Sequence, residues 1–214
     1  MSIIKETLLV KEHIKHPFPD DMHKIIMRSL ENSQHLSQLS PRSDAELLWS
    51  YNPQDNLIVI QHDDAVSIND KDFHKVSQED IPPFTQPQTI TVQGRVSRLY
   101  TPHESLEEGQ KEVLQALGIQ AASSQSKRRS IPIPQEELEE RMKSKLEARN
   151  LDVSHIHAQA ADDLQIGRAR KKRTPTCNLI ATVTGNQEDL NTLVFGGFGK
   201  AKNYGIGLLN ILER

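Results

Sequence analysis

The sequence predicts an α+β protein built from two tandem ferredoxin-like (RRM-like) domains, with a glycine-rich loop near its C-terminal end. Three observations predict this class. The 214 residues suffice for one large domain or two small ones. Periodicity in the first half gives the order strand, helix, two strands, short helix, strand, which is the βαββαβ unit. The second half follows a similar order, so we place the domains at residues 1–94 and 95–214.

Each element of the first half has a local signature. Residues 3–11 are mostly apolar and are followed by two prolines, as expected of a buried strand. The acidic pair at 20–21 can begin a helix. Residues 46–51 and 57–61 flank a turn sequence and predict a β-hairpin, and residues 89–96 alternate apolar side chains as the last strand of the first unit. The apolar stripe of the helix comprises Met22, Ile25, Ile26 and Leu30.

The second half is predicted to contain helices over residues 110–117, 135–150 and 188–195. Strands are predicted over residues 151–166, 178–184 and 205–212, the first two forming a long hairpin. Within the charged helix, Leu138, Met142 and Leu146 recur at every fourth position. This spacing predicts one buried face on that helix.

Composition excludes several classes of protein. Lys plus Arg number 26 against 29 Asp plus Glu, and a net charge of -3 excludes a uniformly basic nucleic-acid coat but allows a local basic patch. The 5 Phe, 1 Trp and 3 Tyr are few for a protein that binds single strands mainly by base stacking. A single cysteine, Cys177, excludes a disulfide framework and multi-cysteine metal sites. With neither a signal-peptide pattern nor a membrane-spanning apolar run, a cytoplasmic protein is expected.

The most specific motif is the glycine- and lysine-rich segment at residues 197–209. It differs from a P-loop because the residue after Lys200 is alanine rather than serine or threonine. It also differs from a dinucleotide fingerprint, because too few residues follow it for a βαβ unit. Glycines let backbone N–H groups approach a phosphate, and Lys200 and Lys202 add positive charge. A turn that only permits close packing is the alternative, and two lysines among four glycines favour phosphate binding.

A basic run lies in the predicted hairpin. Between Leu164 and Gln187 there are five basic residues and no acidic ones. Such a run alone is usually a solvated loop, but beside the glycine-rich segment it indicates contact with a nucleic-acid backbone, and arginine could also reach a guanine edge. The five are Arg168, Arg170, Lys171, Lys172 and Arg173, and a second, shorter cluster comprises Lys127, Arg128 and Arg129.

His23 is the candidate acid–base residue. It lies in the first turn of the first predicted helix, next to the apolar stripe. The partial positive charge of a helix N-terminus lowers the pKa of a histidine and favours the neutral ring, which can act as a base. An ordinary surface or half-buried histidine is the alternative for His23 taken alone.

Taken together, these residues resemble a known family. The pattern Gly-x-Gly-Lys-Ala-Lys-x-Tyr-Gly-x-Gly-Leu-Leu at 197–209 is similar to that of the repeat-associated (RAMP) CRISPR proteins, and in detail to the CasE family of type I-E Cascade endoribonucleases. Residues 21–24, the hairpin at 46–61 and the segment 133–150 agree with the family in order, so the resemblance covers nearly the whole chain.

Two positions depart from the family pattern. Asp20 stands where the family can have a tyrosine one turn before its catalytic histidine. Arg95-Val96-Ser97-Arg98 stands where Arg-x-Asn-Pro is expected.

The resemblance implies a metal-independent endoribonuclease that binds CRISPR repeat stem-loops. It would cleave pre-crRNA into mature crRNA by 2′-OH attack, as part of Cascade in antiviral defence. His23 would serve as general base or acid, and Lys202 would offset charge on the phosphorane. No cofactor, metal or membrane is implied, and the partners are repeat RNA and other Cascade subunits. The implied RNA contacts are Arg28, Arg95, Arg98, Lys127, Arg128, Arg129, Arg168, Arg170, Lys171, Lys172, Arg173, Gly197, Gly199, Lys200 and Lys202.

Two other functions stay open. A repeat-RNA-binding subunit of a CRISPR complex without nuclease activity would be consistent with Asp20 and the negative net charge. A metal-dependent nuclease would need carboxylate pairs such as Asp63-Asp64 or Asp162-Asp163. Adjacent side chains on a strand point to opposite faces, which disfavours this second alternative.

Overall fold

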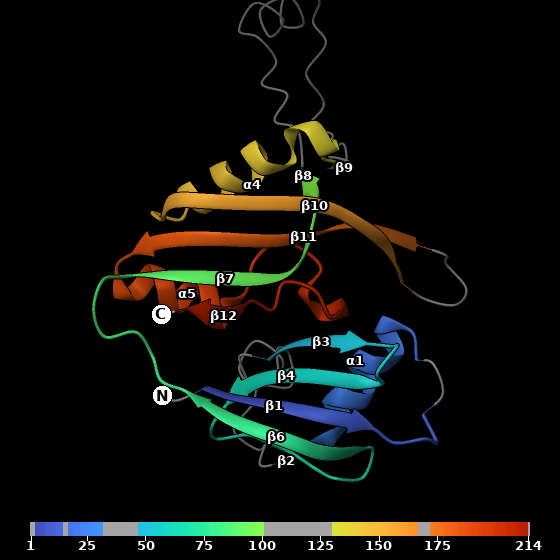
Figure 1. Ribbon diagram of the computed structural model, residues 1–214. Helices are drawn as coiled ribbons and strands as arrows, with labels where there is room; N and C mark the ends of the chain where they lie inside the picture. Colours follow the sequence, from blue (N-terminus) through green and yellow to red (C-terminus); the bar gives the residue numbers. More distant parts are fainter. Residues whose placement is uncertain (1–2, 15–16, 32–46, 101–129, 167–171, 214) are drawn as a thin grey trace, which may run out of the picture.

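The chain folds into two four-stranded antiparallel sheets (Figure 1). The computed structural model describes residues 3–14, 17–31, 47–100, 130–166 and 172–213. The first unit contains β1 (Ile3–Val10), α1 (Pro19–Ser29), β2 (Leu30–Glu31), β3 (Leu48–Asn52), β4 (Leu57–Asp63), β5 (Ser67–Ile68) and β6 (Phe73–Ile81). The second contains β7 (Gln88–Ser97), β8 (Leu99–Tyr100), β9 (Ile131–Pro132), the 3₁₀ helix η2 (Gln135–Glu137), α4 (Leu138–Glu147), β10 (Asp152–Ile166), β11 (Lys172–Gly185), α5 (Gln187–Gly196), the 3₁₀ helix η3 (Lys202–Tyr204) and β12 (Asn210–Glu213).

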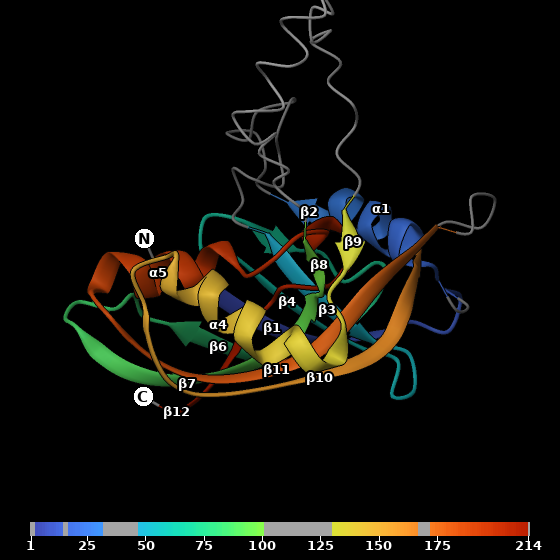
Figure 2. The same ribbon diagram turned by 90° about the horizontal axis from the view of Figure 1, so that it is seen from above.

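Both sheets have the strand order of a ferredoxin-like unit, which confirms the predicted fold class. The first is ordered β3-β4-β1-β6 and the second β10-β11-β7-β12. In each, the first long strand of the unit lies between the third and the fourth. Figure 2 shows α4 and α5 lying in the concave face of the curved second sheet.

The sequence assigns one strand to the wrong sheet, misses another strand, and predicts a short helix where the structure has a strand. Residues 89–96, predicted to end the first unit, lie in β7 and pair with β11 and β12 of the second sheet. The first sheet is completed by β6, which pairs with β1. The sequence pattern misses β6 because only its two terminal residues are buried, so no apolar alternation marks it. The segment between β4 and β6 holds β5, paired with β2, in place of the predicted short helix.

The first core forms between α1 and the first sheet, as the apolar stripe predicts. Met22, Ile25 and Ile26 are buried on one side of α1 and belong to the same cluster as Ile58 and Ile60 of β4. Pro19 begins the helix at a position where its missing N–H removes no hydrogen bond. The last member of the predicted stripe, at residue 30, follows the helix in β2. The stripe therefore fixes which side of α1 faces solvent.

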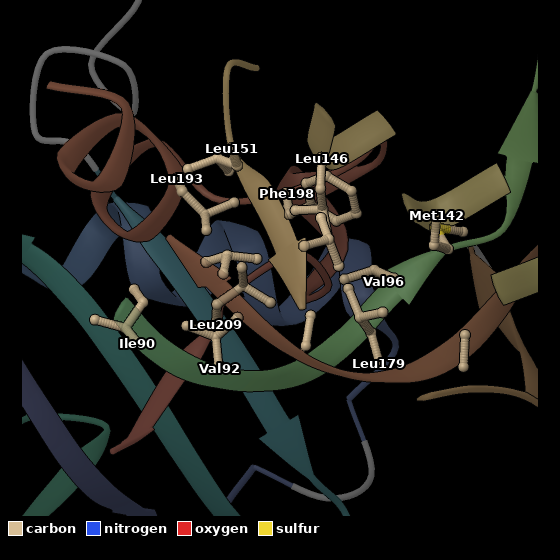
Figure 3. Close-up of a cluster of buried hydrophobic side chains, with 14 of the residues drawn as sticks. Ile90, Val92, Val96, Met142, Leu146, Leu151, Leu179, Leu193, Phe198 and Leu209 are labelled. Carbon is tan, nitrogen blue, oxygen red and sulfur yellow. The ribbon is translucent and has the colours of Figure 1, made fainter. Parts of the chain in front are cut away.

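The second core is the larger and is built from α4, α5, β7 and β11 (Figure 3). Met142 and Leu146 of α4 are fully buried, together with Leu138 at its start, which confirms the predicted face of that helix. The even-numbered β7 residues Ile90, Val92 and Val96 point into the same cluster.

The long hairpin and the short helix at 188–195 are confirmed as β10–β11 and α5. The predicted final strand is shorter than expected, because β12 begins only at Asn210. The backbone at Gly205 and Gly207 has positive φ angles of 79° and 93°, which bend the chain away from a regular strand. The helix predicted at 110–117 lies outside the described residues. Within the described part of the chain, no helix is long and apolar enough to cross a membrane.

A buried carboxylate ties α1 to the start of β6. The Asp72 side chain is 1% exposed and accepts hydrogen bonds from Nε of Arg28 at 3.1 Å and from Nε2 of His13 at 3.0 Å. Burial alone would raise the pKa of Asp72, but the hydrogen bonds and charges of His13 and Arg28 outweigh it and hold the pKa below the usual range.

This network predicts an acid-dependent loss of stability. The folded-state pKa of Asp72 is below its unfolded value, so the contribution is complete above the unfolded pKa and is lost as pH falls through the folded pKa. We expect Asp72→Asn to lower the free energy of unfolding near neutral pH by about 1–3 kcal/mol and to flatten its decline in acid. Denaturant unfolding across that pH range measures both effects. The exposed Asp70→Asn is the matched control, and equal pH slopes for the two variants would contradict this role.

Candidate nucleic-acid interface

The glycine-rich loop at residues 197–209 lies between the two units. Its two arms are joined because Phe198 donates its N–H to the Gly207 carbonyl at 2.8 Å, and Gly207 donates to the Arg95 carbonyl of β7 at 2.8 Å. On the other side, Gly205 lies against the Trp49 ring of β3, so close that a Cβ would come within 2.7 Å of Cε3. The loop therefore contacts both units. The two units are also joined directly by a hydrogen bond that Gln61 of β4 donates from Nε2 to the Val194 carbonyl of α5 at 3.1 Å.

The loop presents its two lysines at the 3₁₀ helix η3. Lys200 donates from Nζ to Oγ of Ser130 at 3.1 Å, and Lys202 donates to the Gly196 carbonyl at the end of α5. Ala201, between them, has a left-handed backbone with φ of 63°, a conformation that costs energy for a residue with a Cβ. A strained backbone conformation persists only where contacts with the surrounding structure hold it in place. Such residues are common at functional sites.

A groove of about 640 Å³ lies beside η3 and unites two of the predicted basic features. Arg173 of the hairpin and Lys200 of the glycine-rich loop both line it, although 27 positions separate them in the sequence. None of its lining residues is acidic. The lining residues are Leu99, Ser130, Pro132, Arg173, Thr174, Pro175, Lys200, Ala201 and Tyr204.

His23 is carried by α1 of the first unit. It is the fifth residue of α1 and is half-buried, with its Nδ1 atom out of contact with solvent, and α1 packs against η3. The two residues predicted to be catalytic, His23 and Lys202, are therefore carried by two elements in contact. They belong to different folding units, so their relative position depends on how the units pack.

Three predicted RNA-binding arginines make contacts within the protein. Arg95 donates from Nε to Oγ1 of Thr176 at 3.0 Å and also binds the Asp162 carbonyl, and burial lowers the pKa of its guanidinium. Arg98 donates from Nη1 to the Ile133 carbonyl at 2.8 Å. Arg28 is the partner of Asp72 described above. Their RNA contacts remain predictions.

Six of the predicted basic residues lie outside the part of the chain that the structure describes. Arg168, Arg170 and Lys171 lie outside the described residues, as do Lys127, Arg128 and Arg129, and Lys172 is described only by its backbone. Gly197 and Gly199 lie in the glycine-rich loop with positive φ angles of 70° and 86°.

Sequence reasoning missed two residues here. Arg149, after the end of α4, donates from Nη1 to the Gly197 carbonyl at 3.2 Å and stacks 5.0 Å from the centre of the Phe198 ring. Tyr204 lines the basic groove. No local pattern signals the Arg149 contact, whereas the position of Tyr204 between Lys202 and Gly205 could have suggested an aromatic side chain at a phosphate site.

Metal-ligating residues do not gather in the described part of the chain, where no three His, Cys, Asp or Glu side chains form a group that could hold an ion. Asp63 accepts a hydrogen bond from the Ala65 N–H at 2.9 Å. Asp162 and Asp163 lie near Arg95, whose charge they favour. Asp63 and the pair Asp162 and Asp163 therefore interact with groups of the protein itself.

No family model and no curated protein sequence matches this chain, but its structure resembles solved CRISPR proteins over nearly its whole length. A CRISPR endoribonuclease Cse3 bound to 19 nt RNA matches with 12% identity and a TM-score of 0.69, covering 99% of both chains. Cas6e from Escherichia coli K-12 matches with 13% identity and a TM-score of 0.65, covering 99% of this chain and 100% of that one. A chain of a CRISPR RNA-guided surveillance complex matches with 13% identity and a TM-score of 0.63, at the same coverage. From the first residue described to the last, this chain therefore has the two-domain fold that Cse3 and Cas6e share.

Proposed function

We propose that this chain is a metal-independent endoribonuclease that binds CRISPR repeat stem-loops and cleaves pre-crRNA into mature crRNA. The observation that carries the proposal is the groove at η3, where Arg173 and Lys200 converge without a carboxylate, next to the helix that carries His23. Phosphate contacts from arginine and lysine supply most of the affinity of such interfaces. The fold shared with a CRISPR endoribonuclease bound to RNA supports the same substrate.

The proposed reaction is an internal transfer at one phosphate. The 2′-oxygen attacks the phosphorus as its proton passes to a base, the bond from phosphorus to the 5′-oxygen breaks, and an acid protonates that oxygen. The products are a 2′,3′-cyclic phosphate and a 5′-hydroxyl. His23 would act as base or acid, and the Lys202 ammonium would stabilise the negative charge of the phosphorane.

The cellular setting is part of the proposal. The protein would act in the cytoplasm with repeat RNA and other Cascade subunits as partners. The likeness to a chain of a surveillance complex supports this assembly.

The test is cleavage of an end-labelled repeat stem-loop RNA by the purified protein in EDTA. A second RNA carries a single 2′-deoxy nucleotide on the 5′ side of the cleaved bond and so lacks the nucleophile. We expect cutting of the first RNA to a cyclic phosphate end, and binding of the second without cutting. Loss of activity in chelator, or cleavage of the deoxy RNA, would contradict the proposed chemistry. Tight binding of both RNAs without cutting would instead indicate the non-catalytic repeat-RNA-binding subunit.

The salt dependence of binding tests the groove itself. If Arg173 and Lys200 each contact a phosphate, Arg173→Ala and Lys200→Ala should each reduce the slope of log affinity against log salt by about 0.7–0.9. Fluorescence anisotropy with an uncleavable repeat RNA measures this slope. Lys143→Ala is the matched control, because Lys143 is exposed on α4 and pairs with Glu147. An unchanged slope in both groove variants would remove these residues from the interface.

A further inference from the structure

The basic groove has a mainly apolar wall. Its two cations lie among Leu99, Pro132, Pro175 and Tyr204. These apolar groups would not help the groove to bind phosphates alone. An ionised phosphate oxygen in contact with apolar atoms loses its hydrogen bonds to water and receives none from the protein in return. The flat, weakly polar face of a nucleobase is the part of RNA that fits such a wall.

Tyr204 is fixed in place by the backbone around it. Its N–H donates to the Ala201 carbonyl at 2.9 Å, and left-handed residues, Ala201 and Gly205, flank the turn. The side chain is half-buried, which leaves part of it accessible in the groove. An aromatic ring on a fixed turn loses little entropy on binding and so makes a good stacking platform.

We propose that this groove holds the base of a single unpaired ribonucleotide, stacked on Tyr204, with the adjoining phosphate held by Arg173 or Lys200. The inference rests on the proposed function and adds a substrate feature to it. A base inside a duplex offers only its edge, so the Tyr204 ring would select a nucleotide outside the paired stem. A volume of about 640 Å³ falls within the range of sites that enclose small molecules.

Charge directs RNA to this groove and away from a second one. That groove, of about 340 Å³, lies between β6 and the C-terminal strand β12 and is lined by Glu79, Asp80 and Glu213 against a single cation, Lys5. Its carboxylates would repel a phosphate. Figure 1 places β12 near the C-terminus and β8 and β9, which border the basic groove, at the opposite end of the second unit.

The experiment uses the repeat RNA made uncleavable by a 2′-deoxy nucleotide, with 2-aminopurine placed at each unpaired position in turn. Stacking on an aromatic ring changes the emission of this fluorescent base. The full-length wild type, Tyr204→Phe and Tyr204→Leu are compared, because phenylalanine keeps the ring and leucine keeps only apolar bulk. We expect one position to respond with the wild type and Tyr204→Phe but not with Tyr204→Leu. We also expect Tyr204→Leu to weaken binding by on the order of 5- to 150-fold, and an abasic nucleotide at the responding position to cancel that difference.

The outcomes separate the inference from the proposed function. If the RNA binds and is cut normally by Tyr204→Leu, with no position whose emission depends on the ring, the inference is overturned and the proposed function stands. If wild-type protein binds no repeat RNA at all, both fall together. A response that the abasic RNA does not cancel places the base elsewhere and also overturns the inference.

Discussion

Alanine in place of His23 should slow cleavage of the repeat RNA by about 10²–10⁴-fold, the usual contribution of a positioned acid–base group. The affinity for uncleaved RNA should stay the same, because His23 is not among the residues that line the basic groove. Single-turnover cleavage with protein in excess measures the chemical step, and anisotropy measures binding. A loss confined to the rate identifies an interaction made in the transition state.

His155→Ala is the matched control, because that histidine is exposed on β10, outside the candidate site. It should cut at the wild-type rate. Wild-type activity in His23→Ala as well would exclude His23 as the essential acid–base group and leave the RNA-binding role intact.

Gly205→Ala should strongly destabilise the fold. The new Cβ would come within 2.7 Å of Cε3 of Trp49, a ring that is 1% exposed and cannot move aside. The backbone φ of 79° adds strain for any residue with a Cβ. We expect a loss of about 3 kcal/mol in the free energy of unfolding. Cleavage should fall as well, because η3, which carries Lys202, packs against both β3 and α1 and would have to move.

Gly196→Ala provides the comparison. A Cβ at Gly196 meets nothing within 4 Å, and the residue ends α5 with an ordinary backbone. Alanine there should be neutral or slightly stabilising, by about 0.5–1 kcal/mol. Equal stability of the two variants in denaturant unfolding would show that the loop does not depend on its contact with Trp49.

The sequence predicted those elements that are determined by residues close together in the chain. The stripe of α1, with Met22, Ile25 and Ile26, needs only helical spacing and one apolar sheet to pack against. The predicted hairpins were confirmed for the same reason, because their strands are neighbours in sequence. The catalytic candidate His23 came from the same kind of evidence, together with a resemblance to a family.

Partners distant in sequence could not be predicted in this way. The alternating apolar residues of β7 are compatible with a central strand in either sheet. In the structure they are buried in the second, larger core, which the sequence pattern alone does not indicate. Arg149 reaches the Gly197 carbonyl across 48 positions, through a contact that neither residue's neighbours encode. Tyr204 and Arg173 line one groove although they belong to η3 and β11, which only the tertiary fold brings to the same surface.

The position of η3 has a consequence for biosynthesis. A ribosome makes α1 early and the glycine-rich loop after almost everything else in the described chain, and β12, which closes the second sheet on β7, follows it. The first unit can fold during synthesis, yet it would hold His23 without η3, the element that carries Lys202, and without the groove. A nascent chain that has not yet made this loop would therefore lack part of the proposed site, and the proposed ribonuclease activity would begin only after the loop has packed against α1 and β3.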